Sequence, residues 1–261
     1  MKRYLYIIIP ILVFSLIIFL LSYDFSKNND LNIIIGKNTV FNKKNNIWSV
    51  NKSYDLKWKK LPIFNIDELD ENNEYYLYKD INGWDIFTED KNVVNVDTSD
   101  IFSYDYINKM NAFNIDEYIE VGNDLLNDEN IQTVINENNL SDKAITTLKK
   151  ISIDLDNDNN TEYIYLLSNR VQGEESSDNN FYSIAFTIFN NNIYYLYKDI
   201  STNPLTCDPS IRNVIDTNND NNYEFVFRCF TYSDVNSVDI LFSYDKKQGY
   251  NKIISNYYNL T

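Results

Sequence analysis

The 261-residue sequence contains no histidine, only five glycines and only four prolines. Without imidazole, the chain has no Ser-His-Asp or Cys-His triad, no His-ligated zinc and no histidine acid–base chemistry. Neither GxGxxG nor GxxxxGK[ST] occurs, so the usual glycine-rich phosphate-binding loops are absent. Carboxylate chemistry remains, but abundant Asp and Glu do not by themselves make a placed catalytic pair. We therefore assign no catalytic residue and expect a protein that is not an enzyme.

Basic residues are also scarce, since 23 Lys and Arg stand against 38 Asp and Glu and give a net charge of −15. Binding to nucleic acid depends on Lys and Arg that neutralise phosphates, so the charge argues against that partner. Aromatic residues make up 15% of the chain, which is too many for a disordered acidic tail. Tyr leads them and is typical of half-buried strands. We therefore expect the acidic chain, whose Asn, Ile, Lys and Tyr content suits an AT-rich bacterial genome, to fold around a core.

One long hydrophobic run is present, at the N-terminus, where Tyr4 to Ser22 carry no charge. These nineteen residues span roughly 28 Å as a helix, which matches the hydrocarbon core of a bilayer. Lys2 and Arg3 precede the run, so the positive-inside rule places the N-terminus in the cytoplasm and the rest outside. A cleaved signal peptide is the alternative, although its apolar core is usually shorter and its small-residue cleavage site is missing here. We predict a retained single-pass anchor that contacts lipid through residues 4–22.

Composition divides the chain into a tip and anchor (1–23), an Asn/Lys-rich stalk (24–46), two β-rich regions (47–113 and 151–261) and a helical insert (114–150). In the β-rich regions, short aromatic and β-branched runs alternate with Asn, Asp and Gly, which predicts mainly antiparallel strands. The insert is predicted from two stretches. Apolar residues from Ile115 to Leu125 recur near a 3.6-residue period, and Ser141 can cap Asp142 to Lys150. The predicted fold class is α+β, mainly antiparallel β, with one transmembrane helix.

The chain has two cysteines, Cys207 and Cys229, and both lie outside the membrane in this prediction. An even number in an oxidising compartment permits one disulfide, which would stabilise the fold by about 3 kcal/mol for a loop of about twenty residues. Alternation places Phe225, Phe227 and Cys229 on one face of a strand. Cys229 should therefore be buried as a disulfide or as a free thiol, and we favour the disulfide.

Acidic residues recur at regular spacing in one short stretch between two predicted strands. Positions one, three, five and nine of this stretch are Asp154, Asp156, Asp158 and Glu162. Calcium takes about six to eight oxygen ligands from alternate side chains, a backbone carbonyl and a closing carboxylate. The carbonyl of Asn160, at position seven, adds a ligand, and Asn159 stands at position six, where such loops turn sharply and usually carry Gly. After Gly, Asn best tolerates the left-handed backbone, so we predict a structural Ca²⁺ site here, in loop 1.

A similar stretch, loop 2, follows 62 residues later, again between predicted strands. Its candidate ligands are Asp216, Asn218, Asp220, the carbonyl of Asn222, and Glu224. With one carboxylate fewer, loop 2 should bind more weakly. Neither loop is an EF-hand, because Tyr165 and Phe227 stand at position twelve, where a bidentate Glu is needed. Chance clustering in an Asn-rich chain is the alternative, and the repetition of the pattern favours metal binding.

At these residues the chain resembles the calcium-loop repeats of the FG-GAP/VCBS type, which occur in integrin-α-like propellers and in many bacterial surface proteins. The resemblance covers about residues 150–230 and rests on the DxDxDxxxE pattern. It implies strand-rich units with structural calcium, on a surface that binds other molecules. The Gly of the family's DxDxDG is replaced by Asn159 and Asn221, and no FG-GAP signature lies upstream.

The heptapeptide YYLYKDI occurs twice, at Tyr75–Ile81 and at Tyr194–Ile200, an offset of 119 residues. At the same offset, the segment from Asp97 to Asp105 aligns with loop 2 as a decayed third loop, with Ser99 and Ile101 in ligand positions. Convergent tyrosine-rich strands in a biased composition are the alternative. Loop spacings of 57 and 62 suit blade-like units of about sixty residues, and three such units cannot close a propeller.

These observations lead to the hypothesis of a membrane-anchored, extracytoplasmic binding or structural module, stabilised by Ca²⁺ and recognising an unknown extracellular protein or glycan. Two alternatives belong to other classes. One is an accessory subunit of a membrane complex, although the anchor lacks GxxxG and any charge that would favour a partner helix. The other is a carboxylate-dependent cell-wall glycan hydrolase.

Overall fold

A computed structural model describes residues 31–35, 39–45, 47–50, 59–60, 63–64, 75–80, 83–88, 93–94, 102–105, 112–115, 118–141, 145–169, 181–201, 207–218, 220–230 and 237–258. The anchor predicted at residues 4–22 lies outside these ranges. Within them, no helix has the length and apolar character needed to cross a membrane.

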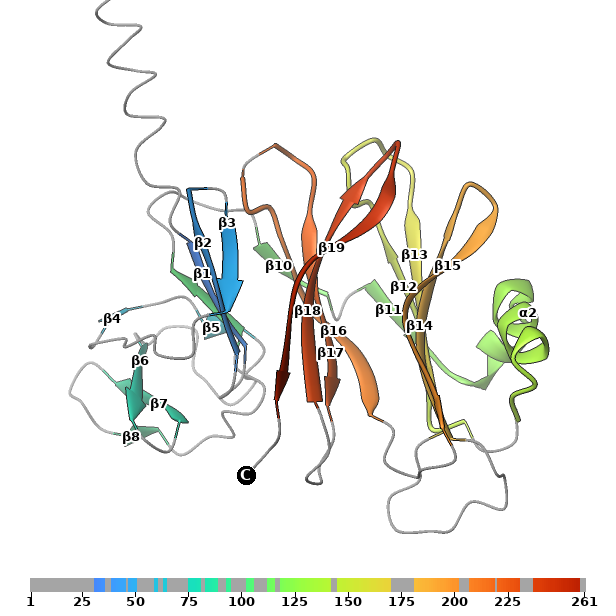
Figure 1. Cartoon of the computed structure of the whole chain (residues 1–261), viewed down its shortest axis with the longest axis horizontal. Coiled ribbons are helices and arrows are strands. Elements are labelled where there is room, and N and C mark those ends of the chain that lie inside the picture. Colours follow the sequence, from blue (N-terminus) through green and yellow to red (C-terminus); the bar gives the residue numbers. More distant parts are fainter. Residues whose placement is uncertain are drawn as a thin grey trace, which may run out of the picture.

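The described strands form four sheets in which every pairing is antiparallel, as predicted (Figure 1). Sheet 1 has the order β3 (Ile47–Val50), β2 (Thr39–Lys44), β1 (Leu31–Ile35), β9 (Phe102–Asp105), β5 (Ile63–Phe64). Sheet 2 has the order β4 (Lys59–Lys60), β6 (Tyr75–Asp80), β7 (Gly83–Thr88), β8 (Val93–Val94).

The C-terminal half of the chain builds the other two sheets. Sheet 3 has the order β11 (Ile119–Val121), β12 (Thr147–Ile153), β13 (Glu162–Ser168), β14 (Phe181–Phe189), β15 (Asn192–Ser201). Sheet 4 has the order β10 (Ala112–Asn114), β16 (Asp208–Ile215), β17 (Glu224–Phe230), β18 (Ser237–Asp245), β19 (Gly249–Tyr258).

Strands β12–β15 and β16–β19 are two copies of one structural unit. Each is a four-stranded meander with an acidic loop between its first and second strands. Each also has a register irregularity after the fifth residue of its third strand, at Ala185/Phe186 and at Leu241/Phe242. The 62 residues that separate the loops therefore span one unit.

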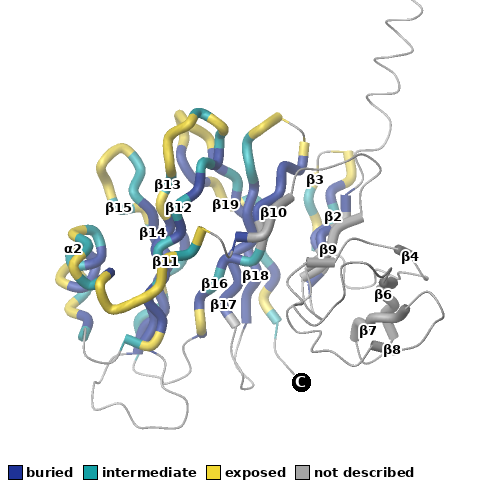
Figure 2. Tube along the Cα trace, turned by 180° about the vertical axis from the view of Figure 1, so that it is seen from behind, coloured by how far each residue is buried: buried dark blue, intermediate teal, exposed yellow. Residues whose placement is uncertain are grey.

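Sheets 1, 4 and 3 and helix α2 stack in layers in that order, and each interface between them is filled by side chains that alternate along the strands (Figure 2). The largest cluster lies between sheets 3 and 4 and includes Ile151, Ile164, Phe225, Phe227 and Ile240. Leu31, Ile33 and Phe41 of sheet 1 cover the other face of sheet 4. The stalk predicted at 24–46 is therefore wrong for β1 and β2, which belong to the folded body.

The outer face of sheet 3 is covered by helix α2 (Glu129–Glu137), which follows a 3₁₀-helix, η3 (Asn123–Asn127). The side chain of Asp128 accepts a hydrogen bond from the backbone N–H of Asn130 and so caps α2. Ile131, Val134 and Ile135 recur at helical spacing and are buried against the sheet. This amphipathic segment lies inside the predicted insert, but the sequence reasoning placed the helices on either side of it.

The predicted helices are wrong where the chain forms strands, although the end of the first, at Leu125, lies in η3. Ile119–Val121 forms β11, and the segment from Thr147 to Lys150 belongs to β12, with Ile119 paired to Ile151. The β-branched residues of these stretches suit a pleated, half-buried surface, and pairing within sheet 3 outweighs the weak helical periodicity.

The YYLYKDI copies both form strands, but their neighbours differ. The first copy lies in β6, between β4 and β7, whereas the second lies in β15, at the edge of sheet 3 next to β14. The decayed loop proposed from Asp97 falls mostly outside the described residues, which resume there with β9.

The predicted disulfide is confirmed, since Cys207 is bonded to Cys229 with 5.2 Å between their Cα atoms. Both residues are buried in the cluster between sheets 3 and 4. The bond joins the residue before β16 to the end of β17, and so closes one end of the second unit.

A buried ion pair links sheet 4 to sheet 1. Arg228 Nε donates to Asp239 Oδ1 at 2.7 Å, and the two side chains are 2% and 0% exposed. Thr39 Oγ1, from β2, donates to Asp239 Oδ2 at 2.6 Å, and Asn256 Nδ2 donates to Thr39 Oγ1 at 2.9 Å. A charge that is buried in this way destabilises the fold unless an opposite charge is paired with it.

We expect Asp239→Ala to lower the free energy of unfolding by about 3–5 kcal/mol, because it leaves the Arg228 guanidinium buried without a counter-ion. Chemical denaturation followed by circular dichroism measures this loss. Asp124→Ala, at an exposed position in η3, is the control and should change stability by less than about 0.5 kcal/mol. Equal losses for the two variants would contradict the structural role of the pair.

Candidate metal centre

Loop 1 runs from the end of β12 to the start of β13, and its backbone is held by two of the predicted ligands. Asp154 Oδ1 accepts from the N–H of Asp158 at 3.1 Å, and Asp154 Oδ2 accepts from the N–H of Asn159 at 2.9 Å. Glu162 Oε2 accepts from the N–H of Leu155 at 2.7 Å. The Leu155 side chain is fully buried in the core between sheets 3 and 4 and anchors the loop. Asn159 has φ 65°, so the left-handed backbone predicted at position six is confirmed.

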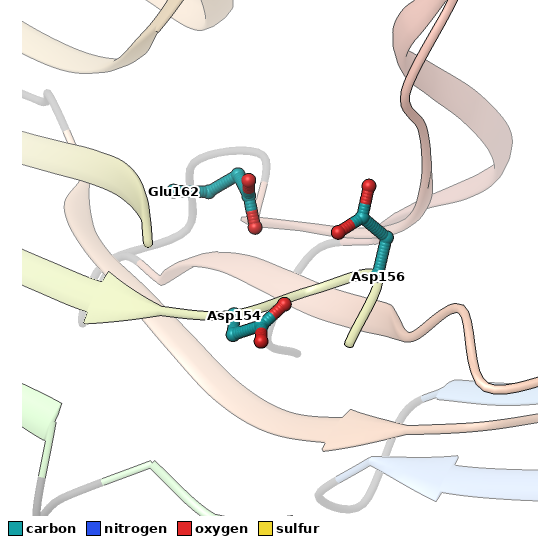
Figure 3. Close-up of side chains that lie close together, drawn as sticks. All are labelled: Asp154, Asp156 and Glu162. Carbon is teal, nitrogen blue, oxygen red and sulfur yellow. The ribbon is translucent and has the colours of Figure 1, made fainter. Parts of the chain in front are cut away.

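Three of the four predicted carboxylates of loop 1 converge. Oxygens of Asp154, Asp156 and Glu162 all lie within 4.8 Å of one another, with the three side chains directed toward a common space (Figure 3). Among the described residues this is the only such acidic group. Asp156 Oδ1 is buried and has no hydrogen-bond partner within the described part of the chain. The cluster therefore offers an oxygen that no protein donor satisfies.

The electrostatics of the cluster are unfavourable without a cation. Burial, followed by the negative charges of Asp158 and Asp154, raises the pKa of Asp156. Burial, followed by the charges of Asp156 and Asp154, raises the pKa of Glu162 against the opposing effect of the Leu155 hydrogen bond. Like charges in a partly buried site disfavour the ionised forms, and a divalent ion would reverse that cost.

The fourth carboxylate, Asp158, is directed to a lysine instead of to the cluster. Its Oδ2 forms an ion pair with Nζ of Lys246, and its Oδ1 accepts from the N–H of Asn160 at 2.8 Å. The Lys246 ammonium, and then the hydrogen bonds from Asn160, lower the pKa of Asp158 to about 2. Asn160, whose backbone carbonyl was predicted to be a ligand, is exposed at the surface of the loop.

Loop 2 repeats the hydrogen-bonding scheme of loop 1. Asp216 Oδ1 accepts from the N–H of Asp220 at 3.2 Å, and its Oδ2 accepts from the N–H of Asn221 at 3.0 Å. Glu224 Oε2 accepts from the N–H of Thr217 at 2.8 Å. Asn221 has φ 64°, as at position six of loop 1. The two loops thus fold in the same way although their position-three residues differ.

The asparagine at position three changes the hydrogen bonds among the side chains of loop 2. Asn218 Nδ2 donates to Asp220 Oδ2 at 2.8 Å, so an amide bridges positions three and five where loop 1 has two carboxylates. Asn222 donates its N–H to Asp220 Oδ1 at 2.8 Å, and the described side chains of loop 2 form no group of three converging acids. Glu224 is buried, and desolvation raises its pKa to about 7. The predicted ligands of loop 2 are therefore hydrogen-bonded to one another or to the loop backbone.

The two loops touch each other at one end of the stacked sheets (Figure 1). The N–H of Tyr223 donates to the carbonyl of Leu155 at 2.8 Å, and Asn157 Nδ2 donates to the carbonyl of Asn221 at 2.9 Å. The β18–β19 turn, which carries Lys246, lies at the same end. Sequence reasoning missed Lys246, because it lies 88 residues from Asp158 and no local pattern connects them.

No family model, no curated protein and no solved structure matches the chain. The resemblance to FG-GAP/VCBS repeats therefore stays a prediction from the loop pattern.

The backbone at position six gives a prediction for stability in EDTA. We expect Asn159→Ala to lower the free energy of unfolding by about 1 kcal/mol, because residues other than Gly, Asn and Asp rarely adopt a left-handed φ. Asn159→Gly should cost clearly less. Thr161→Ala, at an exposed position in the same loop, is the control. Denaturation curves that show Asn159→Gly to be less stable than Asn159→Ala would contradict the assigned backbone conformation.

The raised pKa of Glu224 gives a prediction for pH dependence without metal. Between pH 4.5, the ordinary pKa of Glu, and about 7, the folded protein binds a proton that the unfolded chain lacks. Folding stability from this group is therefore lost as pH rises through that window, by about 3 kcal/mol in total.

We expect Glu224→Gln to gain stability relative to wild type between pH 5 and pH 8, because glutamine has no proton to lose. Urea denaturation in EDTA at both values measures the change. Glu137→Gln, at the exposed end of α2, is the control and should follow the wild-type pH dependence. A parallel pH dependence for wild type and Glu224→Gln would show that Glu224 is not desolvated.

Proposed function

We propose that the chain is a membrane-anchored, extracytoplasmic binding or structural module that is not an enzyme, and that loop 1 holds a structural Ca²⁺ ion. The observation that carries this proposal is the convergence of Asp154, Asp156 and Glu162, with Asp156 Oδ1 buried and unpartnered among the described residues. Two oxygens that each lie about 2.3–2.6 Å from one ion are at most about 5 Å apart. The 4.8 Å limit on the separations in this cluster suits a single shared ion.

The chemistry of the donors favours a hard cation. All the candidate ligands are carboxylate or carbonyl oxygens, whereas sites for zinc or copper use imidazole or thiolate. The sequence has no His, and both Cys residues are used in the disulfide. Calcium tolerates irregular oxygen sites better than magnesium does, and weak calcium sites are filled at the millimolar concentrations found outside cells.

The location is proposed from two observations on different parts of the chain. The uncharged run at residues 4–22 is long enough to span a bilayer, with Lys2 and Arg3 before it. The Cys207–Cys229 disulfide suits an oxidising compartment on the far side of that membrane. In this arrangement the acidic body lies outside the cytoplasm and would meet both calcium and an extracellular protein or glycan partner.

Loop 2 is assigned a weaker role. It has the same backbone scheme, but Asn218 closes it by a hydrogen bond, and no buried carboxylate oxygen among its described atoms lacks a partner. We therefore propose that loop 1 is the first site to fill and that loop 2 mainly supports it through the contacts from Tyr223 and to Asn221.

Calcium should stabilise the full-length protein in detergent. At a calcium concentration a hundred times the dissociation constant, the gain is about 2.7 kcal/mol, which corresponds to an increase in Tm of roughly 5–10 °C over the value in EDTA. Asp156→Asn should abolish the increase, because it removes the negative charge of a ligand whose Oδ1 is buried without a hydrogen-bond partner among the described residues. Asp124→Asn, far from the loop, should keep it. Identical melting in EDTA and in millimolar calcium would rule out the proposed site.

A further inference from the structure

The turn between β18 and β19 brings a positive charge from sheet 4 to the metal-binding loop of sheet 3. Lys246 pairs with Asp158, the position-five residue of loop 1, across 88 residues of sequence. The lysine side chain is 66% exposed, whereas that of Asp158 is 19% exposed. The pair therefore lies at the mouth of the acidic cluster and not within it.

Two tyrosines that flank this turn show that loop 1 and the turn share one electrostatic environment. Burial, and then the charges of Glu162 and Asp156, raise the pKa of Tyr244 to about 12. Tyr250 is 1% exposed, and its hydroxyl has no hydrogen-bond partner among the described residues. Burial and the nearby charges of Glu162 and Asp156 also raise the pKa of Tyr250.

The turn keeps its shape without the lysine contact. Asp245 Oδ1 accepts from the N–H groups of Lys247 and Gln248, both at 2.8 Å. Gly249 adopts φ 79° and lies against the ring of Phe189, which seats the end of the turn on sheet 3. The Lys246 side chain can therefore leave Asp158 while the turn stays folded.

We propose that Lys246 is a tethered cation that holds Asp158 in the metal-free protein and is displaced when Ca²⁺ enters loop 1. This inference rests on the proposed function of loop 1. An ammonium group and a divalent ion repel each other, so a Ca²⁺ ion bound by Asp158 weakens the pairing of that carboxylate with Lys246. Asp158, once released, supplies the position-five ligand, and Lys246 becomes free at the surface. The lysine thereby weakens calcium binding and converts metal occupancy into a change of surface charge beside the loops.

Loop 2 provides an internal comparison. Its position-five residue, Asp220, accepts a hydrogen bond from the amide of Asn218 at position three of the same loop. Loop 1 has a carboxylate, Asp156, at position three, and its position-five residue, Asp158, takes a positive partner from another sheet. The lysine thus performs at the more acidic loop the role that a local amide performs at the other.

Calcium titration of full-length variants in detergent by isothermal calorimetry tests the proposal. Lys246→Met should bind calcium about three- to tenfold more tightly than wild type, because the competing charge is gone. Lys247→Met is the matched control, since it removes the same charge from the next position of the turn, and it should change affinity less than twofold. Lys246→Arg should stay near wild type.

Acetylation of lysines followed by mass spectrometry provides a second readout. Calcium should increase the labelling of Lys246 at least twofold relative to Lys247, and Asp156→Asn should remove that increase. Two results would overturn the displacement and leave the metal site intact, provided that wild type binds calcium. One is that Lys246→Met binds calcium no more tightly than Lys247→Met does. The other is that calcium does not change the labelling of Lys246. If wild type does not bind calcium, both the site and the displacement are overturned.

Discussion

The shared core between sheets 3 and 4 is the constraint on which the rest of the described C-terminal structure depends. Ile151, Ile164, Phe225 and Phe227 fill this interface, and Leu155 extends it into loop 1. Because both units contribute to one core, their first loops emerge at the same end and contact each other through backbone groups. A loop that is anchored by a buried leucine and hydrogen-bonded to its neighbour has little freedom, so the carboxylates of Asp154, Asp156 and Glu162 are positioned before any ligand arrives.

A comparison of the two loops separates the residues of the motif that shape the backbone from the residue that sets the number of carboxylates. Asp at position one and Glu at position nine accept backbone N–H groups in both loops, and this satisfies donors that a tight turn would otherwise leave unpaired. The residue at position three determines the number of carboxylates in each loop. Asn218 donates a hydrogen bond and closes its loop, whereas Asp156 can only accept when ionised, and its Oδ1 finds no donor among the described residues. The same fold of the loop therefore accommodates a turn whose side chains bond to one another or a turn with an unpaired carboxylate oxygen.

Local patterns predicted what is decided within a few residues. The acidic positions, the left-handed Asn159, the antiparallel strands and the disulfide partners all follow from short-range spacing or from having only two cysteines. The predicted helices failed because a segment such as Ile115 to Leu125 has few apolar residues, and its strand pairing to Ile151 depends on residues far along the chain. The pairing of Lys246 with Asp158 had no sequence signal, since it depends on how two units are placed against each other.

The direction in which the two units stack explains why a helix covers the outer face of sheet 3. Phe227 and Cys229 face sheet 3 from sheet 4, but the equivalent residues of sheet 3, Tyr165 and Leu167, face away from sheet 4 and toward α2. The units therefore pack face to back, and such a stack leaves an apolar face at its end. Helix α2 covers that face with its buried residues, and Asn130 and Asp128 reach the hydroxyl of Tyr165. The segment before β12 thus acts as a cap on the stack, because without it the face that joins one unit to the next would be exposed to water.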